Sequence, residues 1–95
     1  MEPLLLVEDK NELRAMLRKA LERHGHSVDE ASDGSAAIQK LRNRRYQMVL
    51  TDLKMPGASG LEVLRESKQA DSTIPVILLT AFGSVDEAVK VLLGP

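Results

Sequence analysis

The sequence predicts an α/β fold in which helices cover both faces of a parallel sheet. Short apolar runs at residues 4–7, 48–50 and 76–79 are typical of strands that are buried on both faces. The segments between them carry apolar residues at the spacing of amphipathic helices. Regular alternation of strands and helices implies a parallel sheet with right-handed crossovers, and the 95 residues fit one small domain.

The first strand, residues 4–7, runs directly into the acidic pair Glu8 and Asp9, and a helix follows. Asp9 and Glu12 have the spacing of a capping box at the start of that helix, and Gly25 is placed to end it. The apolar residues of the helix recur at the spacing expected of one helix face: Leu13, Met16, Leu17, Ala20 and Leu21.

The second strand is expected at residues 27–31, where polar and apolar residues alternate as in an edge strand. The turn Asp33-Gly34-Ser35 follows and caps a second helix. The apolar stripe of that helix is weaker and consists of Ala37, Ile38 and Leu41.

The third strand, Met48-Val49-Leu50-Thr51, delivers Asp52 to its own carboxyl end. Pro56 and Gly57 stop the strand and force a loop. Ser59 and Glu62 have the spacing of a capping box for a third helix, whose first apolar residues are Leu61, Val63 and Leu64.

The fourth strand, residues 76–79, ends on Thr80, and Ser84 with Glu87 predicts the cap of a fourth helix that runs to Leu93. The order of elements is typical of a flavodoxin-like, doubly wound sheet with strand order 2-1-3-4. With no further strand in the sequence, the apolar fourth strand would leave an exposed sheet edge, which natural proteins avoid.

Composition excludes several functional classes. Thirteen basic and 14 acidic residues give a net charge of -1, so we expect no direct nucleic-acid binding. We interpret one basic cluster as a solvated helix end; its members are Lys40, Arg42, Arg44 and Arg45. No cysteine, no signal peptide and no membrane-spanning run is found in the 95 residues, and we expect a cytoplasmic protein without membrane contact.

In a parallel sheet, all carboxyl ends of the strands open on one side, so Glu8, Asp9, Asp52 and Thr80 should meet in one crevice. Two ionised carboxylates about 4 Å apart repel by on the order of 4 kcal/mol at an effective dielectric near 20. Such a cluster should raise a pKa or bind a hard cation: Mg²⁺, with Mn²⁺ or Ca²⁺ as competitors. The alternative is that these acidic residues only cap helices and open turns.

A carboxylate nucleophile beside a divalent cation suits phosphoryl transfer to Asp52, which would give an aspartyl phosphate. The Thr80 hydroxyl could then bond the new phosphoryl group and move its loop, which would make it a switch.

The chain resembles a known family, the receiver domains of two-component response regulators. The motifs that carry the resemblance are Leu-Val-Glu-Asp at 6–9, Asp-Leu-Lys-Met-Pro-Gly at 52–57 with Gly60, and Pro-Val-Ile-Leu-Leu-Thr-Ala at 75–81. The segment at 80–89 is most similar to the NtrC-like branch, whose members activate transcription.

The resemblance implies a role for each site residue. Asp52 would be both the phosphoacceptor and a metal ligand, Asp9 a direct Mg²⁺ ligand, and Glu8 a ligand mostly through water. The backbone carbonyl of Lys54 would complete the protein ligands, and Thr80 would be the switch hydroxyl. The implied partner is a sensor histidine kinase, and the domain would be a signalling module rather than an enzyme.

Family members continue into a fifth strand that ends on Lys-Pro and into a fifth helix, and residues 1–95 include neither. We therefore expect a C-terminally truncated receiver domain that binds metal but is impaired in signalling. We also expect self-association, as a dimer or larger assembly, through the uncovered edge of the fourth strand or through the fourth helix.

Two other classes stay open. A Mg²⁺-dependent phosphatase or phosphotransferase could also use an Asp after a strand, but such enzymes carry a second Asp two residues later, where this chain has Lys54. A flavodoxin-like nucleotide or flavin binder would need a Gly/Ser/Thr-rich loop where Glu8 and Asp9 stand.

Overall fold

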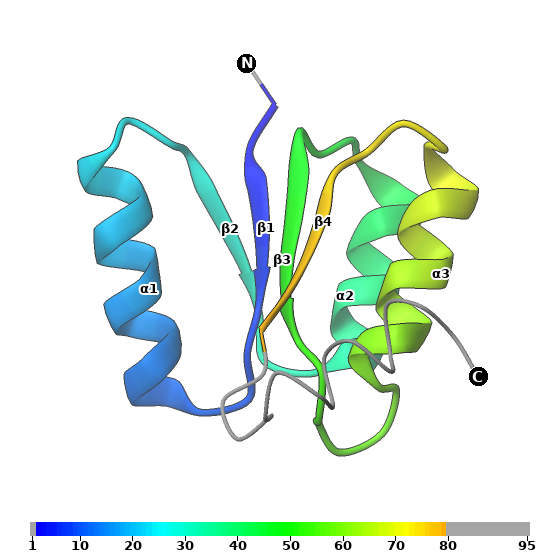
Figure 1. Ribbon diagram of the computed structural model, residues 1–95, viewed down its shortest axis with the longest axis horizontal. Coiled ribbons are helices and arrows are strands. Elements are labelled where there is room, and N and C mark those ends of the chain that lie inside the picture. Colours follow the sequence, from blue (N-terminus) through cyan, green and yellow to red (C-terminus); the bar gives the residue numbers. More distant parts are fainter. Residues whose placement is uncertain (1, 80–95) are drawn as a thin grey trace.

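The structure is a computed structural model that describes residues 2–79. A four-stranded parallel sheet has the order β2-β1-β3-β4; α1 covers one face, and α2 and α3 cover the other (Figure 1). The elements in chain order are β1 (Leu4–Val7), α1 (Asn11–Arg23), β2 (Val28–Ala31), α2 (Gly34–Asn43), β3 (Met48–Asp52), α3 (Gly60–Ala70) and β4 (Val76–Leu79). The predicted α/β class and the flavodoxin-like strand order are confirmed; the predicted fourth helix lies outside the described residues.

The register of the strands aligns their carboxyl ends. In the pair β1–β3, Leu4 lies beside Met48 and Val7 beside Thr51. In the pair β3–β4, Asp52 lies beside Leu79. The residue that follows Val7 and the last residue of β3 therefore reach the same edge of the sheet.

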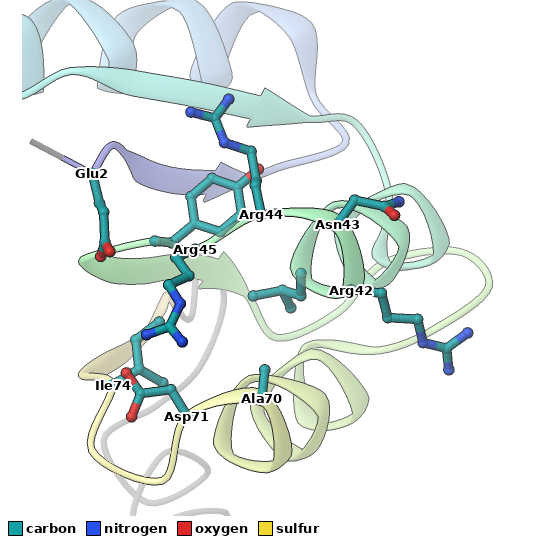
Figure 2. Close-up of a pocket in the computed structure, with 10 residues that line it drawn as sticks. Glu2, Arg42, Asn43, Arg44, Arg45, Ala70, Asp71 and Ile74 are labelled. Atoms are coloured by element: carbon teal, nitrogen blue, oxygen red, sulfur yellow. The ribbon is translucent and has the colours of Figure 1, made fainter.

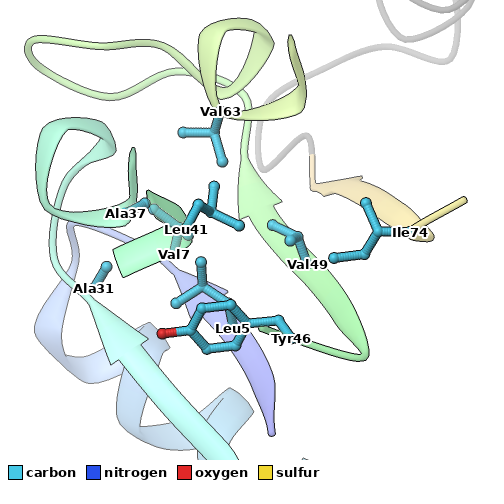
Figure 3. Close-up of a cluster of buried hydrophobic side chains, with 9 residues drawn as sticks. All are labelled: Leu5, Val7, Ala31, Ala37, Leu41, Tyr46, Val49, Val63 and Ile74. Atoms are coloured by element: carbon cyan, nitrogen blue, oxygen red, sulfur yellow. The ribbon is translucent and has the colours of Figure 1, made fainter. Parts of the chain in front are cut away.

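The larger core lies between the sheet and the helices α2 and α3, and we call it the α2/α3 core (Figure 3). It is aliphatic except for the ring of Tyr46, as the composition predicts. Its buried members are Leu5, Val7, Ala31, Ala37, Leu41, Tyr46, Val49, Val63 and Ile74.

The opposite face of the sheet is covered less completely. Its smaller cluster contains Leu4, Leu6, Val28 and Leu50, and α1 adds only the half-buried Leu17 and Leu21. The predicted apolar face of α1 is therefore partly wrong, because no residue of this helix is buried and Met16 is 65% exposed. Within residues 2–79, α1 lies over this face, whereas α2 and α3 cover the other (Figure 1).

The helix caps agree with the sequence except at α1. The Asp33 carboxylate accepts a hydrogen bond from the Ala36 N–H at 2.7 Å, and the Ser59 hydroxyl accepts one from the Glu62 N–H at 3.4 Å. The predicted cap at Asp9 is wrong: α1 has Lys10 at its N-cap position and no side-chain cap. Asp9 instead lies within a group of carboxylates at the edge of the sheet.

The two outer strands differ from the two inner ones in burial. The prediction that β2 is an edge strand is confirmed. Among the described strands β4 is also outermost; its residues are only half-buried or, at Ile77, 47% exposed. In the part of the chain from residue 2 to 79, no helix is long and apolar enough to cross a membrane.

Candidate metal centre at the carboxyl edge of the sheet

The acidic group predicted from the sequence is assembled by the fold. Glu8, Asp9 and Asp52 each offer a carboxylate oxygen, and these oxygens lie within 4.8 Å of one another. Glu8 and Asp52 are buried, at 1% and 6% exposure, and Asp9 is half-buried. The parallel register of β1 and β3 produces this meeting, because it sets Val7 beside Thr51.

Burial and mutual repulsion change the acidity of the group. The pKa of Glu8 is raised from 4.5 to about 7. Burial is the largest cause, and the hydrogen bond with Asp9 and the charges of Asp52 and Asp9 contribute in the same direction. The N–H of Lys10, 3.3 Å from Glu8 Oε2, acts in the opposite direction. The cluster therefore holds a proton near neutral pH unless a cation takes its place.

One carboxylate oxygen of the cluster indicates that the site is suited to a cation. Asp9 Oδ1 is buried and accepts no hydrogen bond from the residues that the structure describes. A buried carboxylate oxygen without a partner is costly, and coordination of an ion would satisfy it. Three carboxylates without histidine or sulfur form a donor set for a hard ion, and the residues present therefore fit Mg²⁺.

The loop after β3 is held tightly against Asp52. The N–H of Lys54 lies 3.4 Å from Asp52 Oδ1, and the N–H of Gly60 donates to the carbonyl of Leu53 at 3.0 Å. A Cβ atom at Gly60 would lie 2.2 Å from the Asp52 carbonyl oxygen, so only glycine fits there. The Thr51 hydroxyl, fully buried, donates to the same carbonyl at 3.0 Å.

Arg14 supports the centre from α1, and the sequence reasoning missed it. Its Nη1 donates to the backbone carbonyl of Glu8 at 2.7 Å, and its Nε lies 3.8 Å from the Glu30 carboxylate on β2. The sequence signal for this role was a basic residue, Arg14, in the first turn of the helix that follows the acidic pair. Its partners could not be identified without the fold, because Glu30 is distant in sequence.

Two of the predicted site residues remain, Thr80 and Lys54. Thr80, the predicted switch residue, lies outside the described residues, as does the segment 80–89 that carries the branch resemblance. The position of Lys54 in the loop after Asp52 agrees with the predicted role of its carbonyl, which stays a prediction.

A cavity of about 270 Å³ lies at the opposite, amino-terminal edge of the sheet, between the carboxyl ends of α2 and α3 (Figure 2). Arg45 extends toward Asp71 within it, whereas Arg42 points away.

The basic cluster next to the cavity makes ion pairs within the chain: Lys40 and Arg44 pair with Asp29, and Arg42 pairs with Glu66. Each of these three basic side chains thus has an acidic partner on a neighbouring element.

Comparison with known proteins decides the family. The sequence model of the response regulator receiver domain matches residues 4–93. The chain belongs to this family. As a receiver domain it is 44% identical over 87 residues to the transcriptional regulatory protein TctD of Salmonella typhimurium, across 92% of this chain and 39% of TctD. It is 34% identical to the sporulation initiation phosphotransferase F of Bacillus subtilis, across 90% of this chain and 68% of that protein.

Solved receiver structures have the same fold. The response regulator TrrA of Thermotoga maritima, in complex with Mg²⁺ and BeF, has a TM-score of 0.82 and 36% identity, across 87% of this chain and 72% of that one. A receiver domain from Clostridium thermocellum has a TM-score of 0.85 and 29% identity, across 98% and 75% of the two chains. The receiver domain described here thus spans less than half the length of TctD and about three quarters of these solved chains.

Proposed function

We propose that this receiver domain accepts a phosphoryl group on Asp52 from a sensor histidine kinase, in a reaction that depends on Mg²⁺. The observation that carries the proposal is the group of three carboxylates within 4.8 Å, in which the buried Asp9 Oδ1 has no partner among the described residues. A cation held by these carboxylates would offset the negative charge of an incoming phosphoryl group, so the site suits the transfer of such a group.

The residues have distinct roles in this proposal. A carboxylate oxygen of Asp52 attacks the phosphorus of a phosphohistidine; the new P–O bond forms as the P–N bond breaks, and the imidazole leaves. When bound, the divalent cation neutralises charge on the phosphoryl oxygens and on the receiving carboxylate. Asp9 would hold the ion directly, Glu8 mostly through water, and Lys54 through its backbone carbonyl.

The partner and output are inferred from relatives. TrrA of Thermotoga maritima has been solved together with the histidine kinase ThkA, which supports a kinase of that kind as the phosphoryl donor here. TctD is a transcriptional regulatory protein, which supports transcription control as the output of a cytoplasmic regulator. We further propose that Thr80 is the switch hydroxyl. Assignment to the NtrC-like branch rests on residues 80–89 alone.

Self-association through the β4 edge remains part of the proposal, supported by the 47% exposure of Ile77. Light scattering over a range of concentrations tests it; a mass that stays that of one chain would contradict it.

The decisive experiment is incubation with acetyl phosphate and Mg²⁺, followed by intact-mass measurement. We expect a labile phosphoryl adduct that is lost with EDTA and in Asp52→Asn. Asp33→Asn is the matched control, because asparagine caps a helix as well as aspartate does and the adduct should persist. An adduct of equal yield in folded Asp52→Asn would contradict the assignment of Asp52. Turnover of phosphate esters that requires Asp52 would favour an enzyme instead.

A further inference from the structure

The loop between β3 and α3, residues 53–59, lies directly on the first turn of α2. Gly34 is buried at this contact, and a Cβ atom added there would lie 2.0 Å from the carbonyl oxygen of Ala58 and 2.8 Å from its Cβ. Both atoms belong to short, stiff groups, so no rotamer change relieves the clash. A side chain at position 34 would have to displace the loop by roughly 1 Å or more, because packed atoms do not approach so closely.

The need for glycine at this position is a matter of space and not of backbone conformation. Gly34 is the first residue of α2, and its φ is not positive, unlike those of Gly25 and Gly57. Alanine would therefore suit the helix itself. What excludes a side chain is the loop that carries Ala58.

The helix is held more firmly than the loop that rests on it. Asp33 caps α2 through the Ala36 N–H at 2.7 Å, and Ala37 and Leu41 are buried in the α2/α3 core. On the loop, Met55 is only partly buried against that core. A clash at Gly34 would thus be relieved by movement of the loop.

The other end of the loop lies at the metal centre. Lys54 has its N–H 3.4 Å from Asp52 Oδ1, and Gly60 fixes the return of the chain through the carbonyl of Leu53. The loop is short, so a displacement at Ala58 is transmitted to the main chain of Lys54.

We propose that Gly34 is a positioning residue for the metal centre. By carrying no side chain, it lets the loop 53–59 lie on α2, and this contact holds the main chain of Lys54 beside Asp52. The proposal rests on the proposed function for the role of that main chain as a metal ligand. Residues that orient ligands from outside the coordination sphere change metal affinity by about tenfold or more when they are replaced.

The test compares Gly34→Ala with Gln39→Ala, a control in the same helix whose exposed side chain only becomes smaller. Two-dimensional NMR of the metal-free proteins reports the loop, and titration with MgCl₂ reports affinity. We expect Gly34→Ala to keep the amide shifts of the sheet, to move those of residues 53–59, and to bind Mg²⁺ about tenfold more weakly or worse. Gln39→Ala should match the wild type in both measurements.

Unchanged loop shifts and unchanged Mg²⁺ affinity in folded Gly34→Ala would overturn the proposal. Should that variant not fold, the wild-type titration decides: Mg²⁺ should move the amide of Gly34 but not that of Gly25, and a Gly34 amide that stays still would overturn it. If the wild type binds no Mg²⁺ at all, the proposed function fails. The contact itself is then still judged by the loop shifts of metal-free Gly34→Ala.

Discussion

The hydroxyl of Tyr46 reaches across β1 to donate a hydrogen bond to Asp29 Oδ2 on β2, at 2.5 Å. The ring of Tyr46 is buried in the α2/α3 core, and Lys40 and Arg44 pair with the same carboxylate. Burial raises the pKa of Asp29, but the bonds from Tyr46 and Lys40 outweigh it, so that the pKa is lowered overall. This contact joins β2 to the segment that leads into β3.

Tyr46→Phe removes only the hydroxyl and keeps the ring in place. We expect it to lower the free energy of unfolding by about 1–3 kcal/mol, because a hydrogen bond to a charged group is lost. Urea denaturation of Tyr46→Phe, Asp29→Asn and the double variant measures the coupling. Fully additive effects of the two substitutions would contradict an energetic role for this contact.

Gly60→Ala should be destabilising because its Cβ would meet the Asp52 carbonyl oxygen at 2.2 Å. We expect a loss of about 1–3 kcal/mol in the free energy of unfolding, as in other overpacked sites. Gly57→Ala, in the loop that precedes α3, is the comparison: its Cβ would lie 3.8 Å from the Ser35 hydroxyl, and its φ of 76° costs alanine about 1–2 kcal/mol. Urea denaturation measures both variants. No loss of stability in Gly60→Ala would contradict the tight contact.

The raised pKa of Glu8 gives the metal-free protein a defined pH dependence. The folded state holds the proton up to about pH 7, whereas the unfolded chain releases it near 4.5. The folded state therefore binds more protons in this window, and stability should fall as the pH rises from about 4.5 to about 7. Urea midpoints in EDTA measure the fall, and Glu8→Gln should flatten it. A wild-type midpoint that rises across this window would contradict the raised pKa.

Asp9→Asn separates stability from metal binding. Removing one charge from the cluster relieves repulsion, so we expect the metal-free variant to be more stable than the wild type by about 1 kcal/mol at neutral pH. The same variant should lose the increase in melting temperature that Mg²⁺ gives the wild type. Calorimetry with EDTA and with MgCl₂ measures both effects. Equal Mg²⁺ stabilisation of variant and wild type would exclude Asp9 as a ligand.

The weak cover provided by α1 predicts unequal costs for two apolar residues. Met16→Gln should change the free energy of unfolding by less than about 0.5 kcal/mol, because the side chain is 65% exposed. Leu6→Ala, at a fully buried position of the same face, should cost about 2–5 kcal/mol. Chemical denaturation measures both. A loss of several kcal/mol for Met16→Gln would show that Met16 is covered in solution.

Three features could be derived from the sequence: the alternation of strands and helices, the strand order, and the meeting of Glu8, Asp9 and Asp52. These features follow from local periodicity and from the rule that parallel strands end at one edge. Asp33 and Ser59 were equally predictable, because a helix cap depends on residues within one turn.

Features that depend on contacts between distant segments are visible only in the folded chain. In the fold, Asp9 does not cap α1, Met16 is exposed, and Arg14 reaches the carbonyl of Glu8. The fold also sets Ala58 against Gly34. Burial, pKa and steric fit depend on the neighbours that packing supplies, and a pattern read along one segment carries no information about those neighbours.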